Sequence, residues 1–151
     1  MKLRGGFTLI EMLVVVAVIG LLSSVLLTSL GPARDKARDS RILQEVNQVR
    51  SLAETLYNGN YSALPNVEGI TAIESISSEE LKKLAKDIQS FGGELVIRRP
   101  LTQPTSYVAY SRMNVKIGVE PNLVTNYYCV DSRGNAGYTT TEPVNTFRCN
   151  F

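Results

Sequence analysis

The sequence contains no histidine and only two cysteines among its 151 residues. Without histidine the chain cannot build a Ser-His-Asp or Cys-His nucleophile pair, nor an HExxH zinc site. Two cysteines are too few for a zinc site made of cysteine alone. These absences exclude the commonest hydrolase and zinc-binding mechanisms. The length allows one modest globular domain at most.

The net charge of the chain is also small. The chain has 16 Lys and Arg residues against 14 Asp and Glu residues, which gives a net charge of +2. A nucleic-acid-binding domain normally concentrates its basic side chains on one face. An excess this small and dispersed gives no such signal, so we do not expect nucleic acid among the partners.

Apolar side chains are concentrated near the N-terminus. Residues 7–30 contain a single charged side chain, that of Glu11. A helix of this length would measure about 36 Å, whereas the hydrocarbon core of a bilayer is about 30 Å thick. Its β-branched residues favour a helix poorly in water, but in lipid a helix satisfies all of its own backbone groups. The sequence therefore predicts a membrane-spanning helix.

Two simpler explanations of this segment are a cleaved signal peptide and a plain membrane anchor. Lys2 and Arg4 fit the start of a signal peptide, but the apolar run is too long and no A-x-A-like site closes it. An anchor leaves Glu11 unexplained, because a carboxylate inside a bilayer costs about 2.5–3.5 kcal/mol and usually has a partner. The segment holds no Lys or Arg to pair with it. Glu11 lies towards one end, so contact with the interface is an alternative.

The residues around Glu11 resemble a processing motif. The run KLRGGFTLIE over residues 2–11 combines a short basic leader, a glycine and F-T-L-I-E. It resembles the class III leader and cleavage motif of type IV prepilins and type II secretion pseudopilins. The resemblance is dense over residues 4–22 and extends more loosely to about residue 58.

This resemblance implies both processing and partners. It implies that a prepilin peptidase cleaves between Gly6 and Phe7, and that Phe7 is then N-methylated. It further implies that Glu11 faces the α-ammonium of Phe7 on a neighbouring subunit, which sets the register between subunits. Lys2 and Arg4 leave with the leader, so the mature side chains sum to zero charge. The implied partners are identical or related pilin subunits in a helical filament, an inner-membrane assembly platform, and membrane lipid before assembly.

Beyond the span the sequence predicts an amphipathic helix. Gly31-Pro32 is expected to mark the exit from the span, because proline kinks or ends a helix. Apolar residues then recur at helical spacing up to Asn58. The stripe they form comprises Ile42, Val46, Val49, Ala53 and Leu56.

The remainder of the chain predicts a small head that covers this stripe. Residues 61–76 have no clear period and are expected to form a loop. Ser77 begins a capping-box pattern, and a second helix follows that Gly92-Gly93 closes. Runs rich in β-branched and aromatic residues predict strands at 94–98, 106–112, 115–119, 123–130 and about 137–141. The fold class is therefore α+β, a long N-terminal helix packed on a small antiparallel sheet, which the resemblance also implies.

Cys129 and Cys149 are the two cysteines. A bond between them would close about 20 residues and stabilise the fold by roughly 3 kcal/mol in the loop-entropy model. Buried free thiols and an intermolecular bridge are the alternatives. A disulfide needs an oxidising compartment, so the head is expected outside the inner membrane. Lys2 and Arg4 also favour an N-terminus inside, but the basic residues Arg34, Lys36, Arg38 and Arg41 follow the span, so the orientation rests on the cysteines and not on the charge count.

Two binding functions find weaker support. Calcium takes six to eight oxygen ligands, yet the acids between residues 115 and 151 are the widely spaced Glu120, Asp131 and Glu142. We therefore expect no metal and no cofactor. DNA capture would need basic and aromatic side chains to gather, although such tyrosines more often lie in a sheet. The candidates are Arg98, Arg99, Arg112, Lys116, Arg133 and Arg148, with Tyr107, Tyr110, Tyr127 and Tyr128.

The sequence thus predicts a structural subunit of a type IV pilus-like or pseudopilus filament, and no enzyme. It would cross the inner membrane once and then enter an extracellular or periplasmic filament. Alternatives are a pseudopilin of a type II secretion system, a minor pilin in DNA uptake and a membrane-anchored binding module. The expected segments are a leader (1–6), a filament-core helix (7–30), an amphipathic helix (31–58) and the head (59–151).

Overall fold

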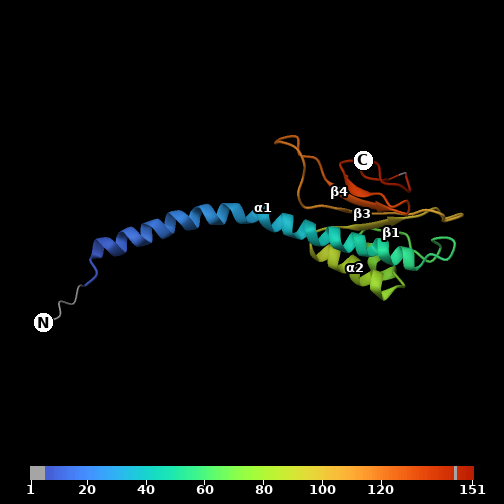
Figure 1. Cartoon of the computed structure of the whole chain (residues 1–151), viewed down its shortest axis with the longest axis horizontal. Coiled ribbons are helices and arrows are strands. Elements are labelled where there is room, and N and C mark those ends of the chain that lie inside the picture. Colours follow the sequence, from blue (N-terminus) through green and yellow to red (C-terminus); the bar gives the residue numbers. More distant parts are fainter. Residues whose placement is uncertain (1–5, 145) are drawn as a thin grey trace. The chain divides into compact units, whose positions relative to one another are not determined.

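The computed structural model describes residues 6–144 and 146–151, so the expected leader lies outside the described residues except for Gly6 (Figure 1). The chain divides into two units, Met1–Arg34 and Asp35–Phe151. The elements in chain order are α1 (Leu9–Thr55), β1 (Val67–Glu68), the 3-10 helix η1 (Ile70–Ser75), α2 (Glu79–Ser90), β2 (Leu95–Arg98), β3 (Val108–Arg112), β4 (Tyr127–Asp131) and β5 (Ala136–Thr139).

The first unit contains the apolar part of α1. The window Leu9–Leu26 has a mean hydropathy of 2.6, and none of it is buried within the chain. By length and composition this window could cross a membrane. Pro32 lies inside α1, so the helix does not end at this position, and the exit from the span at Gly31-Pro32 stays a prediction. A proline removes one backbone hydrogen bond to the preceding turn, and here the helix continues on both sides of that gap.

The second unit is built around the amphipathic part of α1. Ile42, Val46, Val49 and Ala53 are fully buried, as their helical spacing predicts. They pack in one core with the buried face of α2 and with one face of the sheet. The helix ends at Thr55, a few residues before the expected limit at Asn58.

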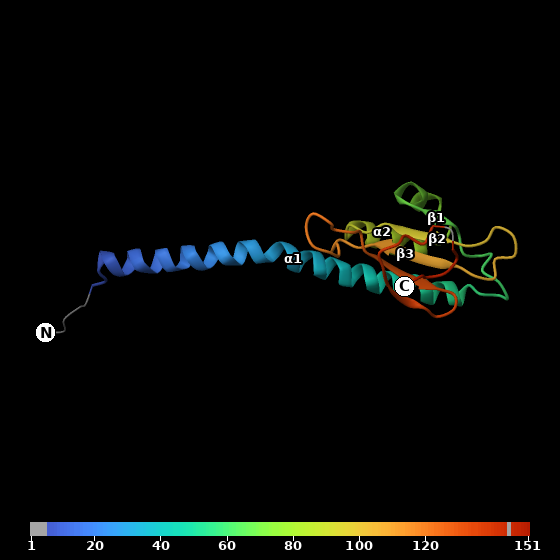
Figure 2. The ribbon, with the colours of Figure 1, turned by 90° about the horizontal axis from the view of Figure 1, so that it is seen from above.

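The sheet is an antiparallel meander of five strands in the order β1-β2-β3-β4-β5. Alternate side chains face opposite sides of a strand. Leu95 and Ile97 therefore face the helices, whereas Val96 joins a second cluster with Cys129 and Cys149. Figures 1 and 2 show α2 on one face of the sheet and the C-terminal tail on the other. The α+β fold class is confirmed.

The second helix forms as predicted, with a shifted start. Ser78 is the N-cap rather than Ser77, and its hydroxyl accepts the N–H of Leu81 at 3.3 Å. The four buried residues of α2 are Leu81, Leu84, Ala85 and Ile88. These are the apolar positions that the sequence pattern places on one face.

Two other expectations are wrong. Residues 61–76 are not a plain loop, because β1 pairs with β2 at the sheet edge and η1 follows. Elements this short carry no periodic signal of their own. Residues 115–119 are not a strand, although Ile117 and Val124 form an isolated bridge. The β-branched side chains there have no face to pack on, and Val119 is 82% exposed.

Candidate assembly segment and disulfide-tied head

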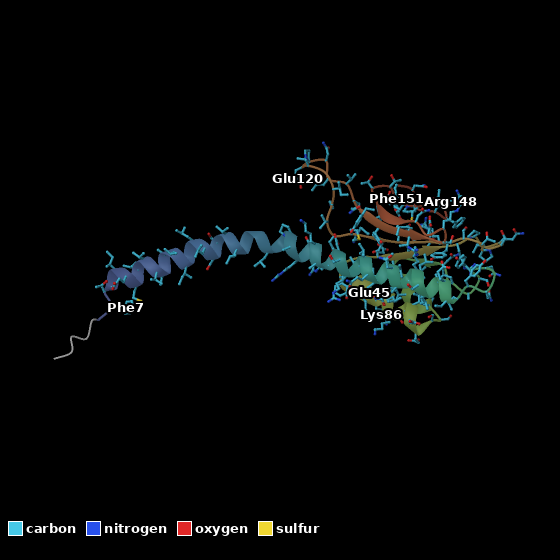
Figure 3. All side chains as sticks on the ribbon, in the orientation of Figure 1. Phe7, Glu45, Lys86, Glu120, Arg148 and Phe151 are labelled. Atoms are coloured by element: carbon cyan, nitrogen blue, oxygen red, sulfur yellow. A yellow bond between two sulfur atoms is a disulfide. The ribbon has the colours of Figure 1, made fainter. Side chains whose placement is uncertain are left out.

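The expected cleavage site lies just before α1 and is accessible. The side chain of Phe7, labelled in Figure 3, is 79% exposed. Apart from its neighbour in the chain, none of the described residues places a heavy atom within 4 Å of the position that a Cβ on Gly6 would take. Among the described residues, nothing therefore covers Gly6 at the entrance to the helix.

Glu11 and Thr8 form a reciprocal cap at the start of α1. The backbone N–H and the hydroxyl of Thr8 both donate to Glu11 Oε2 at 2.8 Å. In return, the backbone N–H of Glu11 donates to Thr8 Oγ1 at 3.3 Å. This is the capping-box arrangement, which satisfies donors at a helix N-terminus. The T-x-x-E spacing in the sequence is the signature of a capping box, which could have indicated this role of Thr8.

The carboxylate of Glu11 has these neutral donors and no cation from its own segment. The sequence contains no Lys or Arg between Phe7 and Ala33. Beside Glu11 lies an apolar hollow of about 360 Å³ that Phe7, Ile10, Val14 and Val15 border. A negative charge at the edge of an apolar helix surface is costly to desolvate unless a positive group meets it. The arrangement is therefore suited to receiving a cation from another chain.

In the head, a disulfide joins Cys129 on β4 to Cys149 in the tail. Beside it lies the fully buried Asp131. Its carboxylate accepts hydrogen bonds from the backbone N–H groups of Cys149, Arg133 and Asn135 at 3.0–3.1 Å. Burial acts to raise the pKa of Asp131, but these bonds and one from the Asn135 amide hold it below its ordinary value. Asp131 thus ties the β4–β5 turn to the disulfide-linked tail.

The three acids considered for calcium do not form one group among the described residues. Asp131 is occupied by the hydrogen bonds just described, and Glu142 accepts the hydroxyl of Tyr110 at 2.9 Å. Glu120 is exposed in the β3–β4 connection. Within residues 6–144 and 146–151, no group of three or more His, Cys, Asp or Glu residues is placed to hold a metal ion.

The aromatic residues considered for DNA stacking lie mostly inside the head. Tyr107 is fully buried, and its hydroxyl donates to Glu54 at 3.2 Å. Tyr110 and Tyr128 are 1% and 7% exposed. Burial and the nearby Glu54 carboxylate raise the pKa of Tyr107, which stays a neutral donor. These three rings belong to the two buried clusters of the head, whereas the ring of Tyr127 is half-buried beside Tyr110.

Comparisons with known proteins give two matches. A family model described as the prokaryotic N-terminal methylation motif matches residues 1–27. A protein of Dichelobacter nodosus described as "Probable minor fimbrial protein" is 30% identical over 117 residues, which cover 72% of this chain and 71% of the relative. No solved structure gives a significant match.

Proposed function

We propose that this chain, which belongs to the type IV pilin family of fimbrial subunits, is cleaved, methylated and then assembled into a filament. It is a pilus-type subunit, and its family is one of structural proteins. In our proposal a prepilin peptidase cuts between Gly6 and Phe7, and the new amine of Phe7 is methylated. The open position of Gly6 and the exposure of Phe7 support access by such an enzyme.

Before assembly the chain spans the inner membrane once through the apolar part of α1. Lys2 and Arg4 favour an N-terminus on the inner side. The bond between Cys129 and Cys149 needs an oxidising compartment, which supports a head on the outer side. An assembly platform then transfers the subunit from lipid into the base of an extracellular filament.

Cleavage supplies the charge that the segment lacks. The amine released at Phe7 is a cation close to the depth of Glu11. In a low-dielectric surrounding, this amine attracts the Glu11 carboxylate of a neighbouring subunit strongly. Apolar helices gain little hydrophobic free energy when they exchange contacts with lipid for contacts with one another. A specific charge contact can therefore determine the axial offset, or stagger, between neighbouring helices. One stagger brings the two groups together, and this fixes the register.

The filament grows because the contact is heterologous. The amine of one subunit meets the carboxylate of another, and a contact between two different surfaces does not close on itself unless the rotation forms a ring. Repetition of this contact gives an open helix with the apolar parts of α1 at its centre.

Among the possible filaments we favour a fimbrial pilus over a secretion pseudopilus. The observation behind this choice is the Dichelobacter nodosus relative, which is described as a fimbrial protein. The expected partners are the prepilin peptidase, the assembly platform and identical or related pilin subunits.

The processing step is tested by Gly6→Val in the full-length chain. The branched side chain at the cut site should leave the leader attached, so the subunit should run at its precursor size in membranes. Gly31→Ala, a glycine change outside the cut site, is the control and should be processed normally. A mature-sized Gly6→Val subunit would contradict the proposed cleavage site.

A further inference from the structure

The connection between β3 and β4 is a projecting hairpin, residues 113–126, with an apolar tip. Its projection beyond the sheet is visible in Figure 1, and Figure 3 labels Glu120 on it. Four apolar side chains of the hairpin are exposed, namely Ile117 (45%), Val119 (82%), Leu123 (37%) and Val124 (48%). Apolar side chains gathered on one projection are typical of interaction sites.

The hairpin is held in place from within and from its base. Ile117 and Val124 exchange two backbone hydrogen bonds of 3.0 and 2.8 Å. At the base, the Asp39 carboxylate on α1 accepts the backbone N–H groups of Asn114 and Val115 at 2.7 and 2.9 Å. A preorganised projection loses little conformational freedom when it binds. These bonds therefore favour a docking role for the tip.

The opposite end of the sheet carries a hollow of about 460 Å³. It has an apolar part and a charged part, and its lining residues are Asn66, Glu68, Arg98, Arg99, Val144 and Phe147. At about 30 Å³ per molecule, it has room for roughly fifteen waters, or for a few side chains. Val144 and Phe147 are 47% and 37% exposed, so their apolar surfaces are available.

The two arginines of the hollow are fixed by the head itself. Arg98 Nε lies 3.1 Å from Glu68 Oε1, and Arg98 Nη1 donates to the carbonyl of Val144. Arg99 Nε donates to the carbonyl of Leu64. Two guanidinium groups beside one carboxylate leave the hollow with an excess positive charge.

We propose that the hairpin of one copy docks into this hollow on the next copy of the chain. Val119 is then covered by Val144 and Phe147, while the Glu120 carboxylate meets the two arginines. Glu120 is the only acidic residue of the hairpin in the sequence, and it lies at the tip. The basic residue of the hairpin, Lys116, precedes the Ile117–Val124 bridge and lies on the side of the base, so the negative charge at the tip is complementary to that of the hollow.

The topology directs this contact to a second copy. The hairpin follows Arg112 at one end of β3, whereas Arg98 pairs with Val108 at the other end. A hairpin therefore cannot enter the hollow of its own head. Since the two surfaces differ and lie at opposite ends, the contact is heterologous, and it repeats along an open helix unless the rotation closes a ring. The inference rests on the proposed function, because it gives the heads of a filament a contact of their own.

The test is site-specific photocrosslinking in assembled filaments. A photoreactive phenylalanine analogue replaces Val119 in the full-length chain, and sheared filaments are irradiated and digested for mass spectrometry. We expect a crosslinked dimer of this chain in which Val119 is joined to the peptides that contain Val144 or Phe147. The same analogue at Lys83, an exposed position on α2, should not reach those peptides.

A charge variant provides a second measurement. Glu120→Lys places like charges together and should lower the yield of filaments and of the Val119 crosslink by about tenfold, a loss of about 1.4 kcal/mol. Glu120→Asp should retain most of both. Filaments that contain the chain but crosslink elsewhere, or to a different pilin, would overturn the contact and leave the proposed function standing. Absence of the chain from every filament would overturn both.

Discussion

Replacing Glu11 by alanine should stop assembly while leaving membrane insertion intact. The substitution removes a carboxylate whose present partners are the neutral donors of Thr8, both at 2.8 Å. In the membrane its loss makes insertion easier, because a charged side chain within an apolar span is unfavourable in lipid. In the filament its loss deprives the Phe7 amine of its proposed counterion.

The size of the assembly defect follows from Coulomb's law. Two unit charges 4 Å apart attract by about 4 kcal/mol at an effective dielectric constant near 20. Since about 1.4 kcal/mol corresponds to a factor of ten, each contact between subunits weakens by about three orders of magnitude. Filament formation multiplies many such contacts, so the variant should yield essentially no fibres.

The assay compares the membrane fraction with the fraction sheared from the cell surface. The Glu11→Ala subunit should accumulate in membranes at wild-type amounts and be missing from the sheared fraction. Ser24→Ala is the control, because it removes a polar side chain from the same apolar helix without changing its charge. Normal fibres built from the Glu11→Ala subunit would refute the charge-pairing argument.

Further predictions concern the head and can be measured by denaturant unfolding of the detergent-solubilised full-length protein. Asp131→Ala should lower the free energy of unfolding by about 3 kcal/mol, because buried donors that include the Cys149 N–H lose their acceptor; an unchanged midpoint would contradict this. The pKa of Asp131 is lower in the folded protein than its ordinary value of 3.8. The carboxylate therefore contributes fully to the free energy of unfolding above pH 3.8, and this contribution is lost as the pH falls through the folded-state pKa. Asp131→Asn should abolish this pH dependence. Reducing the Cys129–Cys149 bond should cost about 3 kcal/mol, which a Cys129→Ser, Cys149→Ser double variant should reproduce in the absence of reductant. Gly93→Ala should cost about 1–3 kcal/mol, since its Cβ would lie 2.6 Å from Ser111 Oγ; stability within 0.5 kcal/mol of wild type would contradict that packing.

The parts of the fold with a regular pattern could be predicted from the sequence. Val46 and Val49 are buried where their spacing on α1 places them, and α2 buries Leu81 and Leu84 in the same way. The short strand β1 could not be predicted, because two residues form no period and their pairing depends on the distant β2. The continuation of α1 through Pro32 could not be predicted, because proline kinks or ends many helices and the sequence does not show that helical turns persist on both sides of it.

The candidate site shows the same division between local and distant signals. Gly6, Phe7 and Glu11 were singled out because their chemistry lies in one short run of the sequence. The cap between Thr8 and Glu11 was also local, and its T-x-x-E spacing could have indicated it. The role of Asp131 could not be predicted, because its donors include a residue that lies far along the chain and meets it only after the tail has folded.

The most direct test of the proposed function is the mass of the N-terminal peptide of this chain recovered from purified filaments. Processing at Gly6–Phe7 predicts a peptide that begins with an N-methylated Phe7. A filament subunit that retains Met1, or a chain that is found only in membranes with its leader attached, would contradict it.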